Sequence, residues 1–135
     1  MCLKPKVQII TGQQLEALLD RNIPNLMYHF IWDGNYYLPT SEEWQKILQE
    51  ITATRPSYLE DRFDCENFAM WTASMVAQKY QYNSCGVCIG QSPWGYHGFN
   101  IIVPSDAGLL YYEPQTGDFE ELDGAGYKAD YILIG

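Results

Sequence analysis

The sequence predicts a single α+β domain in which a central, buried helix that begins at Cys65 packs on an antiparallel β-sheet. The chain has 135 residues, of which 47% are apolar, and this is enough to bury a core without disulfide bonds. Apolar side chains recur at helical spacing after Cys65, and their period changes to two beyond about residue 85. We therefore expect one domain over residues 1–135, with a front half at 1–57 and a working half at 58–135.

Two amphipathic helices are predicted in the front half. A capping box that starts at Thr11 precedes a helix near residues 12–21, and a second one that starts at Thr40 precedes a helix that ends near Thr52. Their apolar residues fall on one helical face, so both helices are expected to be structural.

A hairpin is predicted between these helices. Asp33-Gly34-Asn35 is a turn signal, and it lies between two aromatic, strand-like runs at 27–32 and 36–38.

The working half starts with the helix that carries the cysteine. Asp64 is a favourable N-cap, and Cys65 is then the first helical residue of a segment that extends toward Tyr80. Five runs beyond it alternate with a period of two and are separated by Pro, Gly and Asp turns: 87–89, 98–103, 109–113, 119–122 and 131–134. They predict an antiparallel sheet packed on the helix.

The charge of the chain excludes several classes of partner. The net charge is -9, and the eight Lys and Arg residues are scattered, so we expect no nucleic acid and no membrane as partners. The apolar piece within residues 1–10 is too short for a signal peptide or a membrane span, which predicts a cytoplasmic protein. The oligomeric state is not predicted.

The four cysteines are expected to be free thiols. Without an export signal, Cys2, Cys65, Cys85 and Cys88 are expected to stay reduced. The spacing of Cys85 and Cys88 leaves a zinc-stabilised binding module open as an alternative, with His97 and Cys65 completing the ligand set.

Three residues have the chemistry of a nucleophilic site. Cys65 lies at a helix N-terminus, where backbone N–H groups and the helix dipole favour the thiolate. His97 opens a strand and is predicted as the base and then the acid, and Glu113 at the end of the next strand is predicted to orient its ring. His29 lies in an aromatic run and is expected to be a packed or half-exposed strand residue.

Four further residues are assigned to orientation or to the substrate cleft. Asn100 is the alternative to Glu113 as the orienting group, although strand alternation turns it away from His97. Gln115 follows Glu113, and Trp94 and Tyr96 precede His97 in a loop that contains Gly and Pro and could form a wall of the cleft.

These motifs resemble those of the papain-like and transglutaminase-like cysteine hydrolase superfamily. Asp64-Cys65-Glu66-Asn67-Phe68-Ala69, His97-Gly98-Phe99-Asn100 and Glu113-Pro114-Gln115-Thr116-Gly117 are most similar to the protease domain of the lectin Marasmius oreades agglutinin and its small relatives. The match covers roughly residues 58–120. The resemblance implies a papain-like fold and a catalytic triad of Cys65, His97 and Glu113 in a thiol protease that needs no cofactor.

The predicted reaction is hydrolysis of a peptide or isopeptide bond through an acyl-enzyme, with transfer to an amine not excluded. The resemblance also implies activation by calcium, which the acids Asp61, Asp64 and Glu66 could attract, although its ligands are not assigned. A catalytically silent interaction domain of the same fold and the zinc module remain as alternatives. A peptide or protein is the expected partner.

Overall fold

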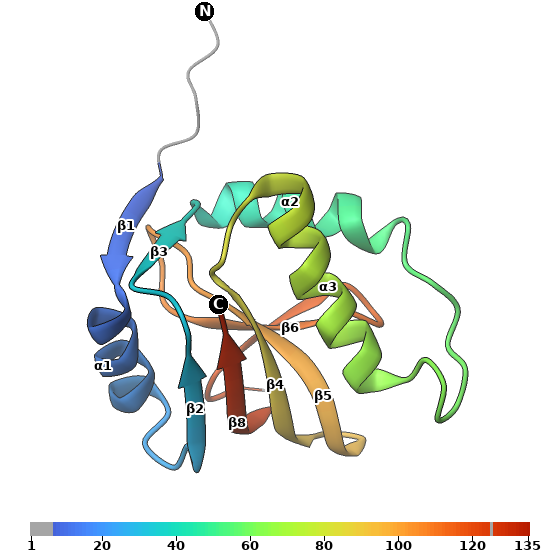
Figure 1. The fold of residues 1–135 in the computed structure, drawn as a ribbon. Helices are drawn as coiled ribbons and strands as arrows, with labels where there is room; N and C mark the ends of the chain where they lie inside the picture. The colour runs from blue at the N-terminus through green and yellow to red at the C-terminus, as the bar shows by residue number, and fades with distance from the viewer. Residues whose placement is uncertain (1–6, 125) are drawn as a thin grey trace, which may run out of the picture.

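The computed structural model describes residues 7–124 and 126–135, so the prediction for Cys2 lies outside the described residues. Within these ranges the chain forms three helices and eight strands (Figure 1). In chain order they are β1 (Gln8–Thr11), α1 (Gly12–Asn22), β2 (Tyr28–Ile31), β3 (Asn35–Leu38), α2 (Ser41–Thr52), α3 (Cys65–Tyr80), β4 (Cys85–Ser92), β5 (Gly95–Ile102), β6 (Leu110–Glu113), β7 (Asp118–Glu121) and β8 (Lys128–Ile134). None of the described helices is long and apolar enough to cross a membrane.

The helices begin where their caps place them. In α1 the backbone N–H of Gln14 donates to the Thr11 hydroxyl at 3.1 Å, and Thr11 donates back to the Gln14 side chain at 2.8 Å. At the start of α3 the backbone N–H of Asp64 donates to Asn67 Oδ1 at 3.2 Å. Since these contacts are local, they fix the starts predicted for both helices.

Six strands form the main sheet in the order β2-β8-β4-β5-β6-β7, and β1 pairs with β3 in a separate two-stranded sheet. All of these pairs are antiparallel except β2 with β8, which is parallel. The predicted purely antiparallel sheet is therefore corrected, because the front half supplies an edge strand that no local pattern assigned to the sheet.

The predicted hairpin between 27–32 and 36–38 is also wrong. Strands β2 and β3 pair with β8 and β1, respectively, and not with each other. The Asn83 side chain holds the connecting segment, since its amide donates to Asp33 Oδ2 at 2.8 Å and to the Asn35 carbonyl at 2.9 Å. Pairing over such sequence distances is invisible to a turn signal.

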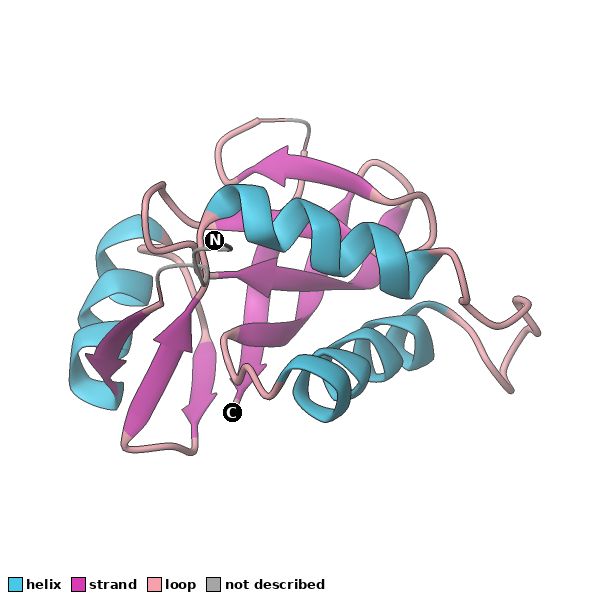
Figure 2. Ribbon diagram, turned by 90° about the horizontal axis from the view of Figure 1, so that it is seen from above, coloured by secondary structure: helices cyan, strands magenta, loops and turns pink. Residues whose placement is uncertain are grey.

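Two hydrophobic cores cover the two faces of the sheet. One contains residues of α1, β1–β3 and one face of the sheet, including Leu15, Leu19, Tyr36, Phe99 and Tyr111. The other contains residues of α2, α3 and the opposite face, including Trp44, Leu48, Val76, Ile102 and Tyr112. The helix α1 accordingly lies at the left of Figures 1 and 2, and α3 lies at the right. The helix α3, predicted as central, thus covers one face of the sheet, and α1 with β1 and β3 covers the opposite face.

Candidate functional site

The start of α3 lies directly against β5. The backbone N–H of Gly98 donates to Cys65 Sγ at 3.4 Å. A Cβ atom at Gly98 would lie 2.7 Å from Glu66 Cα and 2.9 Å from Glu66 N, so only glycine allows this approach of strand and helix. This backbone contact brings Cys65 close to the residues around His97 in space.

The environment of the Cys65 thiol raises its pKa, contrary to the prediction for a helix start. Burial is the main cause, and the neighbouring Glu66 carboxylate, to which Sγ donates at 3.4 Å, adds to it. The Gly98 N–H acts in the opposite direction without outweighing burial. The group at this site is therefore a partly exposed thiol at neutral pH.

His97 is held by a buried carboxylate. Its Nε2 lies 2.6 Å from Glu113 Oε1, and the side chains are 10% and 1% exposed, respectively. Within the described structure the hydrogen bonds of Cys65 go to Gly98 and Glu66 rather than to His97. The structure thus pairs His97 with Glu113 and places Cys65 beside Gly98, the residue that follows His97 in β5.

Glu113 has two further donors. The hydroxyl of Tyr127 donates to Oε1 at 3.0 Å, and the backbone N–H of Gln115 donates to Oε2 at 3.1 Å. Gln115 therefore acts through its backbone. The sequence did not predict Tyr127 as part of the site, since an aromatic residue beside a glycine in a loop gives no sign that it reaches a carboxylate 14 residues earlier in the chain.

Asn100, the alternative orienting residue, has other hydrogen-bond partners than His97. Asn100 is fully buried and donates to the carbonyls of Ala69 and Gly86 at 2.9 and 3.0 Å, so it ties α3 to β4 and does not contact His97. These hydrogen bonds link the helix to the sheet.

The two aromatic residues of the loop differ in position. Trp94 is 63% exposed and its ring lies edge-on to His97 with the centroids 5.5 Å apart, so it flanks the site. Tyr96 is 56% exposed, and desolvation, followed by the neighbouring Asp130, raises its pKa.

The two cysteines of the Cys-x-x-Cys motif cannot share a metal ion. Cys85 belongs to the core under α2 and α3, and Cys88 belongs to the core on the opposite face of the sheet. Their spacing of three residues along a strand turns the two side chains to opposite faces. Both thiols are buried, and burial raises the pKa of Cys85 to about 12. The alternative of a zinc module on Cys85 and Cys88 is therefore corrected.

Comparison with known proteins points to lectins. The family described as ricin-type beta-trefoil lectin C-terminal domain matches residues 5–134. A structure of PSL1a in complex with E-64 has a TM-score of 0.77 and 24% identity, and the match covers 93% of this chain and 51% of that chain. No curated protein matches.

A second solved structure is that of the Polyporus squamosus lectin bound to the human-type influenza-binding epitope Neu5Acα2-6Galβ1-4GlcNAc. Its TM-score is 0.69 at 24% identity, with 93% of this chain and 49% of that chain covered. The chain therefore spans about half the length of the solved structures that it matches.

These comparisons correct the predicted membership of the papain-like and transglutaminase-like superfamily and the papain-like fold, because both the family and the similar structures are those of lectins. The predicted thiol protease or amidase is corrected with them, and a peptide substrate has no support. The prediction rested on the order of a thiol, an imidazole and a carboxylate along the chain, and such an order does not by itself fix a fold or a reaction.

Proposed function

This chain belongs to the family described as ricin-type beta-trefoil lectin C-terminal domain, and we propose that it is a ligand-binding module whose site centres on Cys65, His97 and Glu113. The observation that supports this proposal most is the hydrogen-bonded carboxylate of Glu113. It is 1% exposed, and hydrogen bonds with His97, Tyr127 and the backbone of Gln115 hold it beside the partly exposed thiol. A desolvated polar cluster of this kind is costly to maintain and is typical of functional sites.

The first ligand to test is E-64, the compound named in the complex of PSL1a. We expect the full chain to bind it, and we expect occupied protein to be protected from iodoacetamide at Cys65. Peptide mapping by mass spectrometry reports the protection residue by residue. Cys85 and Cys88 serve as internal controls, because both are buried and should stay unlabelled in the folded protein.

Two variants make this test specific. Cys65→Ser should reveal whether binding survives without the thiol. His97→Ala should weaken binding while leaving a folded chain, which circular dichroism verifies. If E-64 binds equally well to both variants and to the original chain, the site lies elsewhere and the proposal fails.

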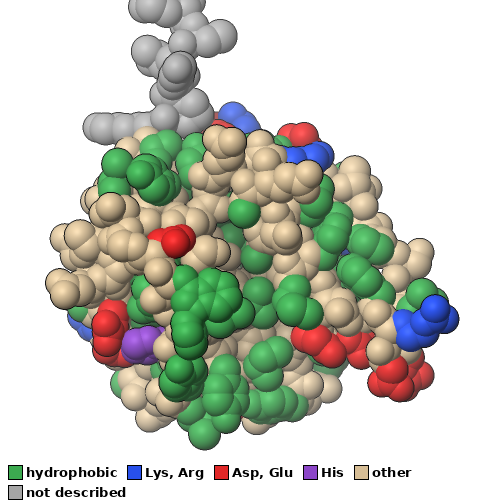
Figure 3. All heavy atoms as spheres, viewed as in Figure 1, with side chains coloured by type: hydrophobic (Ala, Val, Ile, Leu, Met, Phe, Trp, Pro, Cys, Tyr) green, Lys and Arg blue, Asp and Glu red, His purple; other side chains and the backbone are tan. Residues whose placement is uncertain are grey.

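Carbohydrate is a second candidate ligand, and a surface of exposed aromatic residues favours it. We call this surface the β2–β8 face; its residues are between 38% and 59% exposed and comprise Tyr28, Phe30, Trp32, Tyr131 and Leu133. Figure 3 shows hydrophobic side chains gathered over β2 and β8. Exposed aromatic rings offer flat apolar faces to the C–H groups of a sugar, with polar tips for its hydroxyls.

The charge of the chain sets the direction of the carbohydrate test. With a net charge of -9, the neutral disaccharide Galβ1-4GlcNAc should bind at least as well as the sialylated epitope of the Polyporus squamosus lectin. Saturation-transfer NMR would detect either sugar. Trp32→Ala should remove the signal and Trp94→Ala should not. Retention of the signal in Trp32→Ala would rule out the β2–β8 face.

Calcium beside the start of α3 is a further part of the proposal. Asp64 Oδ1 is buried without a hydrogen-bond partner. A hydrogen bond with the Glu66 carboxyl group, followed by desolvation and the nearby charge of Glu66, raises the pKa of Asp64, and a cation between the two acids would relieve their repulsion. Calcium should raise the melting temperature of the original chain and not that of Asp64→Asn.

A further inference from the structure

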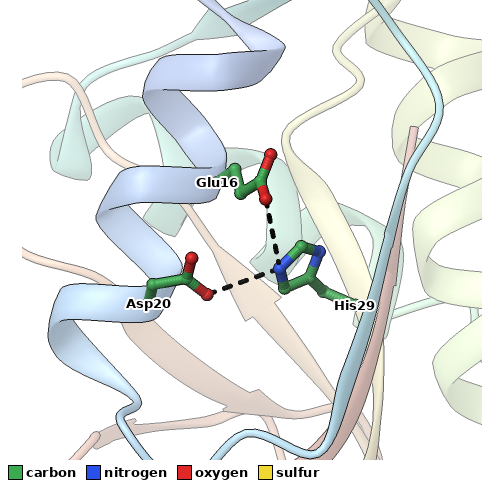
Figure 4. A group of neighbouring side chains, drawn as sticks. All are labelled: Glu16, Asp20 and His29. Carbon is green, nitrogen blue, oxygen red and sulfur yellow. Dashed lines mark ion pairs between the residues drawn. The ribbon is translucent and has the colours of Figure 1, made fainter.

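Three side chains outside the site converge between α1 and β2. Figure 4 shows Glu16 and Asp20 on the helix pointing at the ring of His29 on the strand. His29 Nε2 lies 3.4 Å from Asp20 Oδ1 and 3.9 Å from Glu16 Oε1. One donor atom from each residue lies within 4.8 Å of the other two.

The elements themselves produce this convergence. Glu16 and Asp20 are four residues apart in α1 and so lie on one helical face. Tyr28 and Phe30 of β2 are exposed on the opposite side of the strand, and alternation turns His29 toward the helix. The positions of the three donors therefore follow from a helix, a strand and their packing.

We propose that Glu16, Asp20 and His29 bind a divalent transition-metal ion, for which Zn²⁺ is the best fit. Tetrahedral zinc with bonds of about 2.0–2.1 Å separates its ligand atoms by about 3.3 Å. The distance from His29 to Asp20 already has this value, and Glu16 needs to approach by roughly half an ångström. Two carboxylates also neutralise the charge of the ion.

The donor set discriminates between metals. An imidazole nitrogen is a good ligand for zinc, copper or nickel, whereas calcium and magnesium take oxygen ligands. The three side chains leave a fourth position open. A surface hollow of about 290 Å³ lined by Glu16, His29 and residues of β2 adjoins them, and it leaves space for water or an external ligand.

The competing explanation is an ion pair between a protonated His29 and the two acids. Both explanations predict contact, but they differ in response to metal. A zinc site binds one equivalent of the ion through the lone pair of Nε2, whereas a simple ion pair does not require zinc and binds none stoichiometrically.

Calorimetric titration of the full chain with zinc chloride at about pH 7.5 tests the proposal. The Cys65→Ser variant is used as the background, so that binding at the thiol does not contribute. One equivalent should bind. His29→Ala and Asp20→Asn should each lower the affinity at least tenfold, and Glu42→Gln, an exposed acid on α2, should leave it unchanged.

Nitrogen NMR of the imidazole rings makes the assignment, because the chain has two histidines. The ring of His29 should shift with one equivalent of zinc and that of His97 should not. Glu16→Gln, which keeps the shape of the side chain, provides a second variant should either of the others fail to fold. Absence of zinc binding, a shift of His97 alone, or unchanged affinity in His29→Ala would each overturn the proposal.

Discussion

Glu113 shows how a single buried charge organises its surroundings. Its carboxylate is removed from water, which is costly unless donors replace the lost hydration. The imidazole of His97, the hydroxyl of Tyr127 and the backbone of Gln115 supply these donors from three segments of the chain. The orientation of the His97 ring therefore depends on residues that lie far from it in sequence.

Replacing Tyr127 by phenylalanine tests this dependence. The substitution removes the donor at 3.0 Å from Oε1 and leaves a buried charge with fewer partners. We expect the free energy of unfolding to fall by about 2 kcal/mol, the range for a hydrogen bond to a charged group. Urea denaturation measures the loss. Tyr28→Phe, at an exposed phenol, should change stability by less than about 0.5 kcal/mol; a similar loss in both variants would refute the explanation.

A second prediction concerns the reactivity of Cys65. Burial and then the Glu66 carboxylate raise the pKa of the thiol, and Glu66→Gln removes the second cause. The thiol pKa should fall, and the thiolate fraction at about pH 7.5 should rise. Alkylation by iodoacetamide should accelerate by about threefold, as followed by mass spectrometry of the Cys65 peptide. Glu60→Gln is the matched control, and a rate that is unchanged in Glu66→Gln would show that burial alone sets the pKa.

The contact between α3 and β5 positions Cys65 in the candidate site. A strand and a helix start approach so closely at Gly98 that a Cβ atom would meet the backbone of Glu66 and Cys65. Backbone atoms cannot swing aside as the end of a flexible side chain can, so a clash must shift a whole element.

Gly98→Ala should accordingly destabilise the protein by about 2–3 kcal/mol, measured by urea denaturation. It should also change the alkylation rate of Cys65, since the Gly98 N–H would no longer reach Sγ at 3.4 Å. Gly108→Ala is the control, because a Cβ atom there meets nothing within 4 Å. Equal stability of the two variants would contradict the close packing of α3 against β5.

The same elements show which features the sequence could reveal. The starts of α1, α2 and α3 were predicted because Thr11, Thr40 and Asp64 give local signals. The pairing of β2 with β8 was missed, since it joins segments about a hundred residues apart and depends on the final packing.

The same distinction applies to the candidate site. Its chemistry-bearing residues could be selected by type and order, and whether they act as proposed stays a prediction. The high pKa of Cys65 could not be derived from its position at a helix start, because burial and Glu66 oppose the helix. Family membership came from the whole chain and not from these few residues.

The complete molecule is bound together by strands from both ends of the chain. β8 lies between β2 and β4 in the main sheet, and the Tyr36 hydroxyl donates to the Ile134 carbonyl at 2.8 Å. Residues of the front half, such as Leu19, share one core with residues of β8, such as Ile132. The two halves of the chain therefore do not have separate cores.

Leu19→Ala tests this shared core. Leu19 is fully buried, and its truncation should cost about 2–4 kcal/mol through lost burial and an unfilled cavity. Because the core is shared, the loss should lower a single unfolding transition for the whole chain rather than create a separate early one. Tryptophan fluorescence and far-ultraviolet circular dichroism should report the same lowered midpoint.

Met70→Ala, at a residue that is 48% exposed on α3, should leave the midpoint nearly unchanged. Two separated transitions in Leu19→Ala would show that the halves fold independently, and the cooperativity argued from β8 would then be lost.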